Sequence, residues 1–406
     1  MTVSASTRGD RVLSAERAPS RTPADSRLQS STTYPEGGGN GDSAKGLRVA
    51  ALLEQAVAIP RPAEVLLQQA RELIDPDMRS AVHRLSPLSR RVVEYHLGWS
   101  DAQGRPAQRS GKAIRPALTL LAAAAAGGSS GRALSGAVAV ELVHNFSLLQ
   151  DDVMDGDVER RNRPAAWAVF GASQALCASD SLLVLAAQVL AEQPGDGARE
   201  ALVALLRATQ EMVAGQAADV GSFADGAFGR DDYVALAEAK TGALMQGAAM
   251  IGALLAGADE GLVTDLGRFA RELGVMFQAV DDILDIWGAP EAIGRPTGSD
   301  VRAKKASLPI VCGLEVDGAL LGAPGGDCST AETITRLNAA GAYESALAEA
   351  ERHHRLALAW IRRATMPDAV RAELAALAAH VLGRALDCRA SSCPDVNQQN
   401  PEKEQS

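Results

Sequence analysis

Apolar residues recur at intervals of three and four along most of the chain, the periodicity of helices with one buried face. The pattern predicts two or three helices between Leu47 and Leu97, a region punctuated by several prolines. Further helices are expected from Lys112 through the alanine-rich run, within the stretch 141–167, and over residues 172–190, 198–220, 231–257, 265–287 and, with one irregular insert, 310–386. Nothing alternates with the period of a strand. We therefore expect one all-α domain, a helical bundle over residues 47–386.

Both ends of the chain differ from this central part. Residues 1–46 are rich in Ser, Thr, Arg, Gly and Pro, and residues 387–406 are polar. Segments of this composition cannot bury an apolar core, so we expect two disordered tails. The N-terminal tail is either passive or a docking segment for a partner or a protein compartment, and its residues leave both interpretations open.

Composition narrows the class of protein. The 406 residues are 47% hydrophobic but only 3% aromatic, which favours helices over a β-sandwich. A net charge of −10 gives no support to nucleic-acid binding. Five cysteines without zinc-type spacing indicate a reduced, intracellular protein, so we expect the cytoplasm.

No transmembrane segment is expected. The N-terminus lacks the basic and then apolar order of a signal peptide. The least polar long window, Thr241 to Ala258, contains Gln246 and several glycines, so it is interpreted as a buried helix rather than a membrane span.

Two acidic clusters are the strongest chemical signal. Asp151, Asp152 and Asp155 follow an apolar run, and the same spacing returns as a second cluster. The second cluster contains Asp281, Asp282 and Asp285. Positions i, i+1 and i+4 of a helix share one sector, so the three carboxylates of each cluster repel one another unless a cation lies between them. One such cluster could be a solvated helix end, but two among apolar residues favour Mg²⁺ held together with substrate phosphates.

Basic residues lie near these clusters. Lys112 and Arg115 stand at a predicted helix start, where free N–H groups already favour an anion. Arg160 and Arg161 follow the first cluster and suit bidentate phosphate contacts. An ordinary basic helix start would explain Lys112 and Arg115 equally well.

Three further positions are candidates with competing interpretations. His144 lies about two turns before Asp151, so it is either a core histidine or part of the site. Lys240 stands within an apolar helix, where it either extends to the surface or faces an anionic ligand. The Gly/Pro-rich segment 288–309 carries Arg295 and Lys305; it is either a solvated connection or a basic loop that closes over phosphates.

Taken in order, these motifs resemble the polyprenyl synthetase family, the trans-isoprenyl diphosphate synthases. The resemblance spans about Leu47 to Leu386. It rests on the two aspartate clusters, the GKxxRP element at Lys112 and Arg115, the pair Lys240–Thr241, and the late segment with Asp300, Lys305 and SLP; Phe277 and Gln278 match the Phe–Gln before the second cluster. The chain departs at Gln150, where His is common, at Ser110–Gly111, where the family has two glycines, and at Arg295, where Lys is usual.

The resemblance implies an isoprenoid-synthase fold, with about ten core helices around a deep central cavity, usually as a homodimer. It implies an enzyme that condenses isopentenyl diphosphate with an allylic diphosphate, using Mg²⁺, with three ions per active site. The six aspartates would hold the metal. Lys240, Thr241, Gln278, Arg295 and Lys305 would act on the allylic diphosphate, and Lys112, Arg115, His144, Arg160 and Arg161 would hold isopentenyl diphosphate.

In this family, product length depends on residues just before the first cluster, here Phe146 and Ser147. One aromatic beside a small residue implies geranylgeranyl diphosphate, with farnesyl diphosphate as the alternative. A class I terpene cyclase is a weaker interpretation, because the second aspartate cluster and the GKxxRP element are both present. A non-catalytic partner subunit is disfavoured because all six aspartates are present. A third interpretation, a metal-dependent scaffold or interaction protein that acts through its tail, stays open.

Overall fold

The protein is described here by a computed structural model that covers residues 60–107, 113–128, 131–221, 228–289, 297–303, 305–321 and 328–392. These residues form helices and no strand, which confirms the predicted all-α fold. The helices are α2 (Ala63–Val82), α3 (Pro87–Leu97), α4 (Ile114–Ala125), α5 (Gly131–Met154), α6 (Ala166–Phe170), α7 (Ala172–Ala191), α8 (Ala198–Gly221), α9 (Arg230–Ala237), the π-helical turn η2 (Glu238–Gly242), α10 (Ala243–Leu255), α11 (Glu260–Trp287), α13 (Ser299–Arg302), α14 (Leu308–Val316), α15 (Thr330–Ala339), α16 (Ala342–Arg363) and α17 (Asp368–Ser392).

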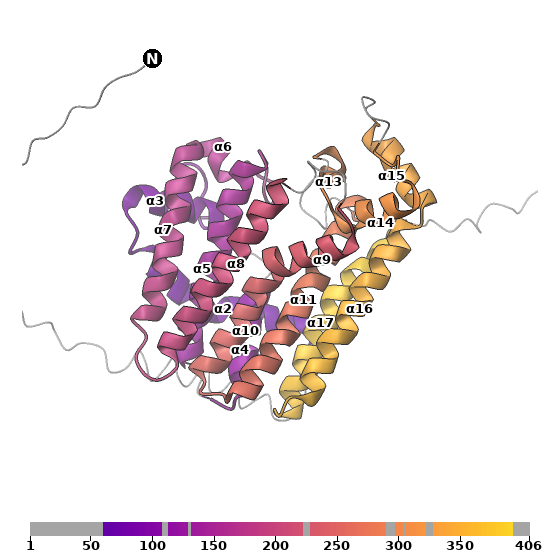
Figure 1. The fold of residues 1–406 in the computed structure, drawn as a ribbon. Coiled ribbons are helices and arrows are strands. Elements are labelled where there is room, and N and C mark those ends of the chain that lie inside the picture. Colours follow the sequence, from indigo (N-terminus) through magenta and orange to yellow (C-terminus); the bar gives the residue numbers. More distant parts are fainter. Residues whose placement is uncertain are drawn as a thin grey trace, which may run out of the picture.

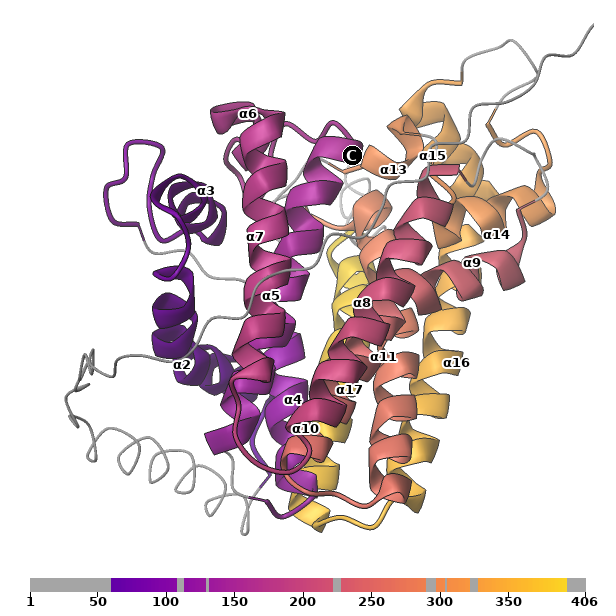
Figure 2. The same ribbon diagram turned by 60° about the vertical axis from the view of Figure 1, so that its left-hand side comes forward.

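The long helices stand side by side as a bundle (Figure 1). Helix α11 packs against α10, α16 and α17, and α5 packs against α4 and α7. Figure 2 shows α5 and α11 with their C-terminal ends at the same end of the bundle, near α6 and α13. Since each acidic cluster lies in the last turns of its helix, this shared direction brings the two clusters to one end of the molecule.

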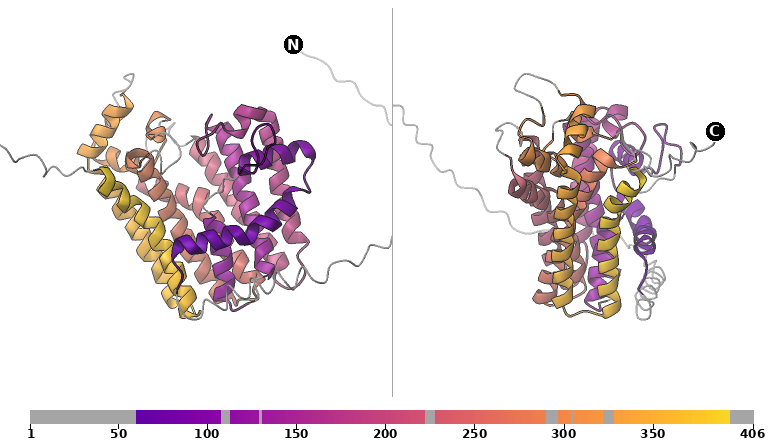
Figure 3. Two further views of the ribbon diagram at one scale, coloured as in Figure 1. Left: turned by 180° about the vertical axis from the view of Figure 1, so that it is seen from behind. Right: turned by 90° about the vertical axis from the view of Figure 1, so that its right-hand side faces the viewer.

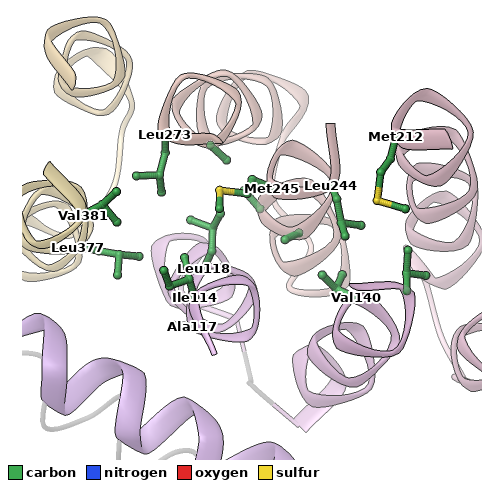
Figure 4. Packing of buried hydrophobic residues seen from close by; sticks show 14 of the residues in the cluster. Ile114, Ala117, Leu118, Val140, Met212, Leu244, Met245, Leu273, Leu377 and Val381 are labelled. Atoms are coloured by element: carbon green, nitrogen blue, oxygen red, sulfur yellow. The ribbon is translucent and has the colours of Figure 1, made fainter. Parts of the chain in front are cut away.

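The core is built mostly from Ala, Leu, Val and Ile. Figure 4 shows Leu118 and Ile114 of α4 meeting Met245 of α10 and Leu377 of α17. Helices α4 and α10 approach closely because Gly252 has no side chain; a Cβ there would lie 2.0 Å from the backbone oxygen of Thr119. Gly252 therefore sets the spacing between α4 and α10.

Several predicted boundaries need correction. Helix α11 begins at Glu260 rather than near Asp265, because the Asp259 side chain accepts a hydrogen bond from Leu262 N at 2.9 Å and caps the helix. Helix α17 continues to Ser392, past the predicted domain end at Leu386. The predicted N-terminal tail, residues 1–46, lies outside the described residues.

Helix α2 runs across the long helices on the back of the bundle (Figure 3, left). Among the described helices, Ala172–Ala191, which is α7, is long and apolar enough to cross a membrane by length and composition. This helix packs against α5, α3 and α8.

Candidate active site

A cavity of about 720 Å³ opens among α4, α5, α8, η2 and α11. Its apolar wall includes Phe146, Met212, Val213 and Val220. Its polar lining contains most of the residues that the sequence singled out: Arg115, His144, Ser147, Asp151, Arg160, Arg161, Lys240, Thr241, Gln278 and Asp281. One apolar chamber thus carries cations, carboxylates and hydroxyl groups along its boundary.

The three carboxylates of the first cluster have different surroundings. Asp151 lines the cavity, and burial raises its pKa to about 6, although Lys240 opposes this rise. Asp152 is buried and forms an ion pair with Arg160 at 2.5 Å. Asp155 accepts a hydrogen bond from Lys305 Nζ at 2.6 Å. Asp151 is therefore the carboxylate of this cluster that faces the main cavity directly.

The three carboxylates of the second cluster also have different surroundings. Asp281 lines the cavity and forms an ion pair with Arg384 of α17 at 3.0 Å. Asp285 is fully buried and accepts hydrogen bonds from Ser299 Oγ and from Asp300 N. Asp282 is buried and accepts three hydrogen bonds, from Tyr233, Gln278 and Leu308 N. Its burial raises its pKa to about 6 despite these donors.

A smaller polar pocket of about 160 Å³ lies between the two clusters. It is lined by Asp151, Asp155 and Asp282 together with Lys240 and Lys305. Within the described part of the chain, no three carboxylate, histidine or cysteine side chains form a ready-made ion site. The donor set is nevertheless oxygen-rich and anionic, which suits Mg²⁺ completed by phosphate oxygens from a substrate.

The basic side of the cavity is formed by α4, α5 and the segment after α5. Arg115 Nη1 lies 3.2 Å from His144 Nε2, and because a guanidinium only donates, the imidazole nitrogen accepts. Burial and the charge of Arg115 hold the pKa of His144 well below its ordinary value, so the ring is neutral. Burial raises the pKa of Glu141, although the charges of Arg115 and Arg161 oppose this rise. Cations thus outnumber carboxylates here, as expected of an anion site.

Lys240 and Thr241 lie in η2, where the N–H of Ala243 bonds to the oxygen of Glu238. Such π turns are frequent at functional sites. Lys240 Nζ lies 2.5 Å from Asp219 of α8, so it neither extends into solvent nor stands unpaired. Gly215 allows this contact between helices, since a Cβ there would lie 2.5 Å from Lys240 N. Thr241 donates to Gln278 Oε1 at 2.7 Å.

Some site residues were not predicted from the sequence. Asp219, Tyr233 and Arg384 contact predicted residues, but each is far from its partner along the chain. A carboxylate partner for Lys240 could have been expected from the cost of an unpaired buried ammonium, although its position could not. Two predicted residues, Lys112 and Arg295, lie outside the described residues.

Comparison with known proteins agrees with this geometry. The model of the family described as polyprenyl synthetase matches residues 102–321. The (2E,6E)-farnesyl diphosphate synthase of Mycobacterium tuberculosis is 42% identical over 332 residues, covering 79% of this chain and 92% of the relative. The geranylgeranyl diphosphate synthase of the same organism is 40% identical over 253 residues, covering 62% of this chain and 72% of the relative.

A solved structure extends the comparison to the fold. The crystal structure of a polyprenyl synthetase from Streptomyces coelicolor has a TM-score of 0.74 and 42% identity, covering 79% of this chain and 99% of that one. Sequence, fold and cavity agree. The chain therefore belongs to the polyprenyl synthetase family and is a prenyltransferase, a trans-prenyl diphosphate synthase.

Proposed function

We propose that this enzyme condenses isopentenyl diphosphate head-to-tail with an allylic diphosphate and releases geranylgeranyl diphosphate. One observation carries the proposal. A single apolar cavity has carboxylates of both clusters, Asp151 and Asp281, on its boundary, and the cationic residues Arg115, Arg160 and Lys240 beside them. This arrangement suits a substrate with an anionic diphosphate head and a long apolar tail.

Prenyl synthases of this family generally use Mg²⁺. We propose Asp151, Asp155 and Asp281 as its direct ligands, because each lines the cavity or the smaller polar pocket and the contacts of Asp155 and Asp281 are to the side-chain cations Lys305 and Arg384. Asp282 also lines the polar pocket, but three hydrogen-bond donors already hold its two oxygens. The other three aspartates would support them through hydrogen bonds and ion pairs. When bound, Mg²⁺ neutralises charge that develops on the departing diphosphate. The number of ions, three by resemblance, stays a prediction.

The side chains around the ion site would bind different parts of the allylic substrate. Lys240 and Lys305, with Arg295, would hold the allylic diphosphate and stabilise it as it leaves. Thr241 and Gln278 present oxygen atoms beside the same region and would face the cationic carbon. The apolar wall would keep water from that carbon.

Isopentenyl diphosphate would occupy the basic side. Arg115, Arg160 and Arg161, with Lys112, would bind its phosphates, and neutral His144 would orient Arg115. The two diphosphates would then lie on opposite sides of the acidic clusters, with their hydrocarbon parts together in the cavity. No side-chain nucleophile is needed for this reaction.

We propose that the size of the side chains just before the first cluster, Phe146 and Ser147, determines product length. Ser147 lies one turn before Asp151, and its hydroxyl donates to the backbone oxygen of His144 at 2.9 Å, so it leaves room for a chain. Phe146 beside it is buried and adds bulk. We propose a twenty-carbon product on this basis. Farnesyl diphosphate is the second candidate, favoured by the 42% identity to a farnesyl diphosphate synthase.

We further propose a homodimer, which the outer face of α8 supports. Positions 203, 206, 210, 213, 217 and 220 are exposed and alternate in steps of three and four, the spacing of a helix-pairing seam. Four of them are large and apolar: Val203, Leu206, Val213 and Val220, the last 67% exposed. Because Val213, Ala217 and Val220 also line the cavity, a second copy would cover one of its walls.

The test is incubation of the purified enzyme with Mg²⁺, labelled isopentenyl diphosphate and, separately, dimethylallyl, geranyl and farnesyl diphosphates. A twenty-carbon product supports the proposal, and a fifteen-carbon product replaces it with the farnesyl alternative. No incorporation, together with a hydrocarbon formed from a long prenyl diphosphate, would contradict chain elongation and indicate a cyclase. We expect the enzyme to act in the cytoplasm, because the five cysteines of the sequence show no zinc-type spacing and indicate a reduced protein.

A further inference from the structure

Tyr233 lies outside the main cavity but is connected to it. It is the fourth residue of α9. The first turn of this helix is capped by a hydrogen bond from Gly229 N to Asp232 Oδ2, 2.9 Å long. The side chain of Tyr233 is only 2% exposed. Its hydroxyl donates to Asp282 Oδ2 at 2.7 Å. A buried hydroxyl with this one acidic partner has a fixed direction, so it can determine where the carboxylate lies.

Asp282 also accepts hydrogen bonds from residues of α11 and α14. Its second oxygen, Oδ1, accepts from Gln278 Nε2 at 2.8 Å, one turn earlier on the same helix. Its first oxygen also accepts from Leu308 N, the first residue of α14, at 3.0 Å. With three donors around a buried carboxylate, the orientation of Asp282 is fully determined by its neighbours.

Gln278 links Asp282 to Thr241 at the wall of the main cavity by hydrogen bonds. Its Nε2 is used by Asp282, so its Oε1 points to the other side, where it accepts from Thr241 Oγ1 at 2.7 Å. Thr241 and Gln278 both line the main cavity, whereas Tyr233 does not. Four side chains from α9, η2 and α11 therefore form one continuous chain of hydrogen bonds that ends at the cavity wall.

We infer that Tyr233 is a positioning residue, which orients Asp282 and, through it, the Gln278–Thr241 pair at the reacting end of the allylic substrate. The inference rests on the proposed function for its kinetic consequence but not for its geometry. Without the hydroxyl, Asp282 Oδ2 keeps one donor instead of two and can rotate, and rotation removes the acceptor that fixes the Gln278 amide. The amide can then turn over and present its NH₂ group to Thr241 and to the cavity.

The test compares Tyr233→Phe with a matched control, Tyr343→Phe. Tyr343 is also a buried tyrosine, and its hydroxyl donates to the backbone oxygen of Ala385 at 2.9 Å, within the α16–α17 pair. Both variants lose one buried hydroxyl, so both are expected to lose some thermal stability. Below their melting temperatures, Y233F is expected to lose about 10–100-fold in kcat while KM for isopentenyl diphosphate changes little. Y343F is expected to keep the wild-type kcat.

A double variant tests the route of the effect. Asp282→Asn leaves one acceptor oxygen where the carboxylate has two, so Tyr233 and Gln278 no longer both find an acceptor. In the D282N background, Y233F is expected to reduce kcat by little more, because the connection is already broken. Equal kcat for Y233F and Y343F, or losses that multiply in the double variant, would overturn the inference.

Crystal structures of the wild type and Y233F separate this inference from the proposed function. A rotated Asp282 or Gln278 in Y233F supports the positioning role even if the wild type transfers no prenyl group, a result that would count against the proposed function alone. Asp282, Gln278 and Thr241 in unchanged positions would overturn the inference whatever the activity.

Discussion

Lys305 Nζ lies 2.6 Å from Asp155 Oδ2, although the two residues are 150 positions apart in the sequence. The contact brings the segment before α14 against the first acidic cluster. Burial is the largest single influence and lowers the pKa of Lys305, but the hydrogen bond with Asp155 and the negative charges of Asp155, Asp300 and Asp219 together raise the pKa overall, so the side chain is a cation. Asp155 is one of the carboxylates that we propose as Mg²⁺ ligands, and a cation held beside it could turn to a diphosphate when the ion binds.

Replacement of Lys305 by Met is expected to raise KM for the allylic diphosphate by about ten- to a hundredfold, the usual range for one charge-assisted hydrogen bond. Steady-state kinetics with varied allylic substrate measures this. Arg302→Met, which removes an exposed cation from α13, serves as control and is expected to leave KM unchanged. Equal effects of the two substitutions would mean that only overall charge matters.

The raised pKa of Asp151, about 6, predicts how stability depends on pH. A carboxyl whose pKa is higher in the folded state than in the unfolded state favours folding when protonated. Its contribution is therefore full below its ordinary pKa of about 4 and is lost as the pH rises through about 6. In chelator, the unfolding free energy of the wild type is expected to fall over this range.

Asp151→Asn is expected to flatten that decline, because an amide does not titrate. Denaturant unfolding in chelator at several pH values measures both proteins. Mg²⁺ with inorganic diphosphate is expected to restore wild-type stability at neutral pH, since the bound cation favours the ionised carboxylate. A wild-type stability that rises between pH 4 and 6 in chelator would contradict the assignment of Asp151 as a buried, destabilising charge.

Product length is expected to respond to Ser147 and Phe146 in opposite directions. Ser147→Phe fills the wall one turn before Asp151 and is expected to shift the product toward fewer isoprene units. Phe146→Ala removes a buried ring that lines the cavity and is expected to shift it toward more, with some loss of stability. Chromatography of the dephosphorylated products measures both. Unchanged products from both variants would locate the cavity floor elsewhere.

The outer face of α8 is expected to hold two copies together. Leu206→Glu with Val213→Glu places charges on the exposed seam and is expected to yield monomers in sedimentation experiments. Leu88→Glu, at a more exposed position on α3, is the control and is expected to leave the dimer intact. If the double variant still sediments as a dimer, the interface lies on another face.

Residues that depend on helical periodicity could be predicted from the sequence. Asp151 and Asp281 lie where their i, i+1, i+4 patterns placed them, because an α-helix fixes neighbours three and four residues apart. Which aspartates of each cluster face the cavity and which are held by other residues could not be predicted. The partners of Asp152 and Asp285 come from loops and short helices after each cluster.

Tyr233 and Arg384 could not be predicted from the sequence either. Each reaches its aspartate through tertiary packing, and nothing local in the sequence marks it. The start of α11 could have been found from Asp259, a capping residue placed just before the helix.

The π turn at 238–242 has a consequence for how α9 and α10 are oriented. A π turn holds one more residue than a regular turn, so it shifts the angular phase between the helix before it and the helix after it. Tyr233 can therefore face α11 while most of α10 is buried against α4, α8 and α11. Deleting one residue within 238–242 would restore a regular helix but rotate one of these faces by about 100°. We therefore expect this segment to reject a change in its length.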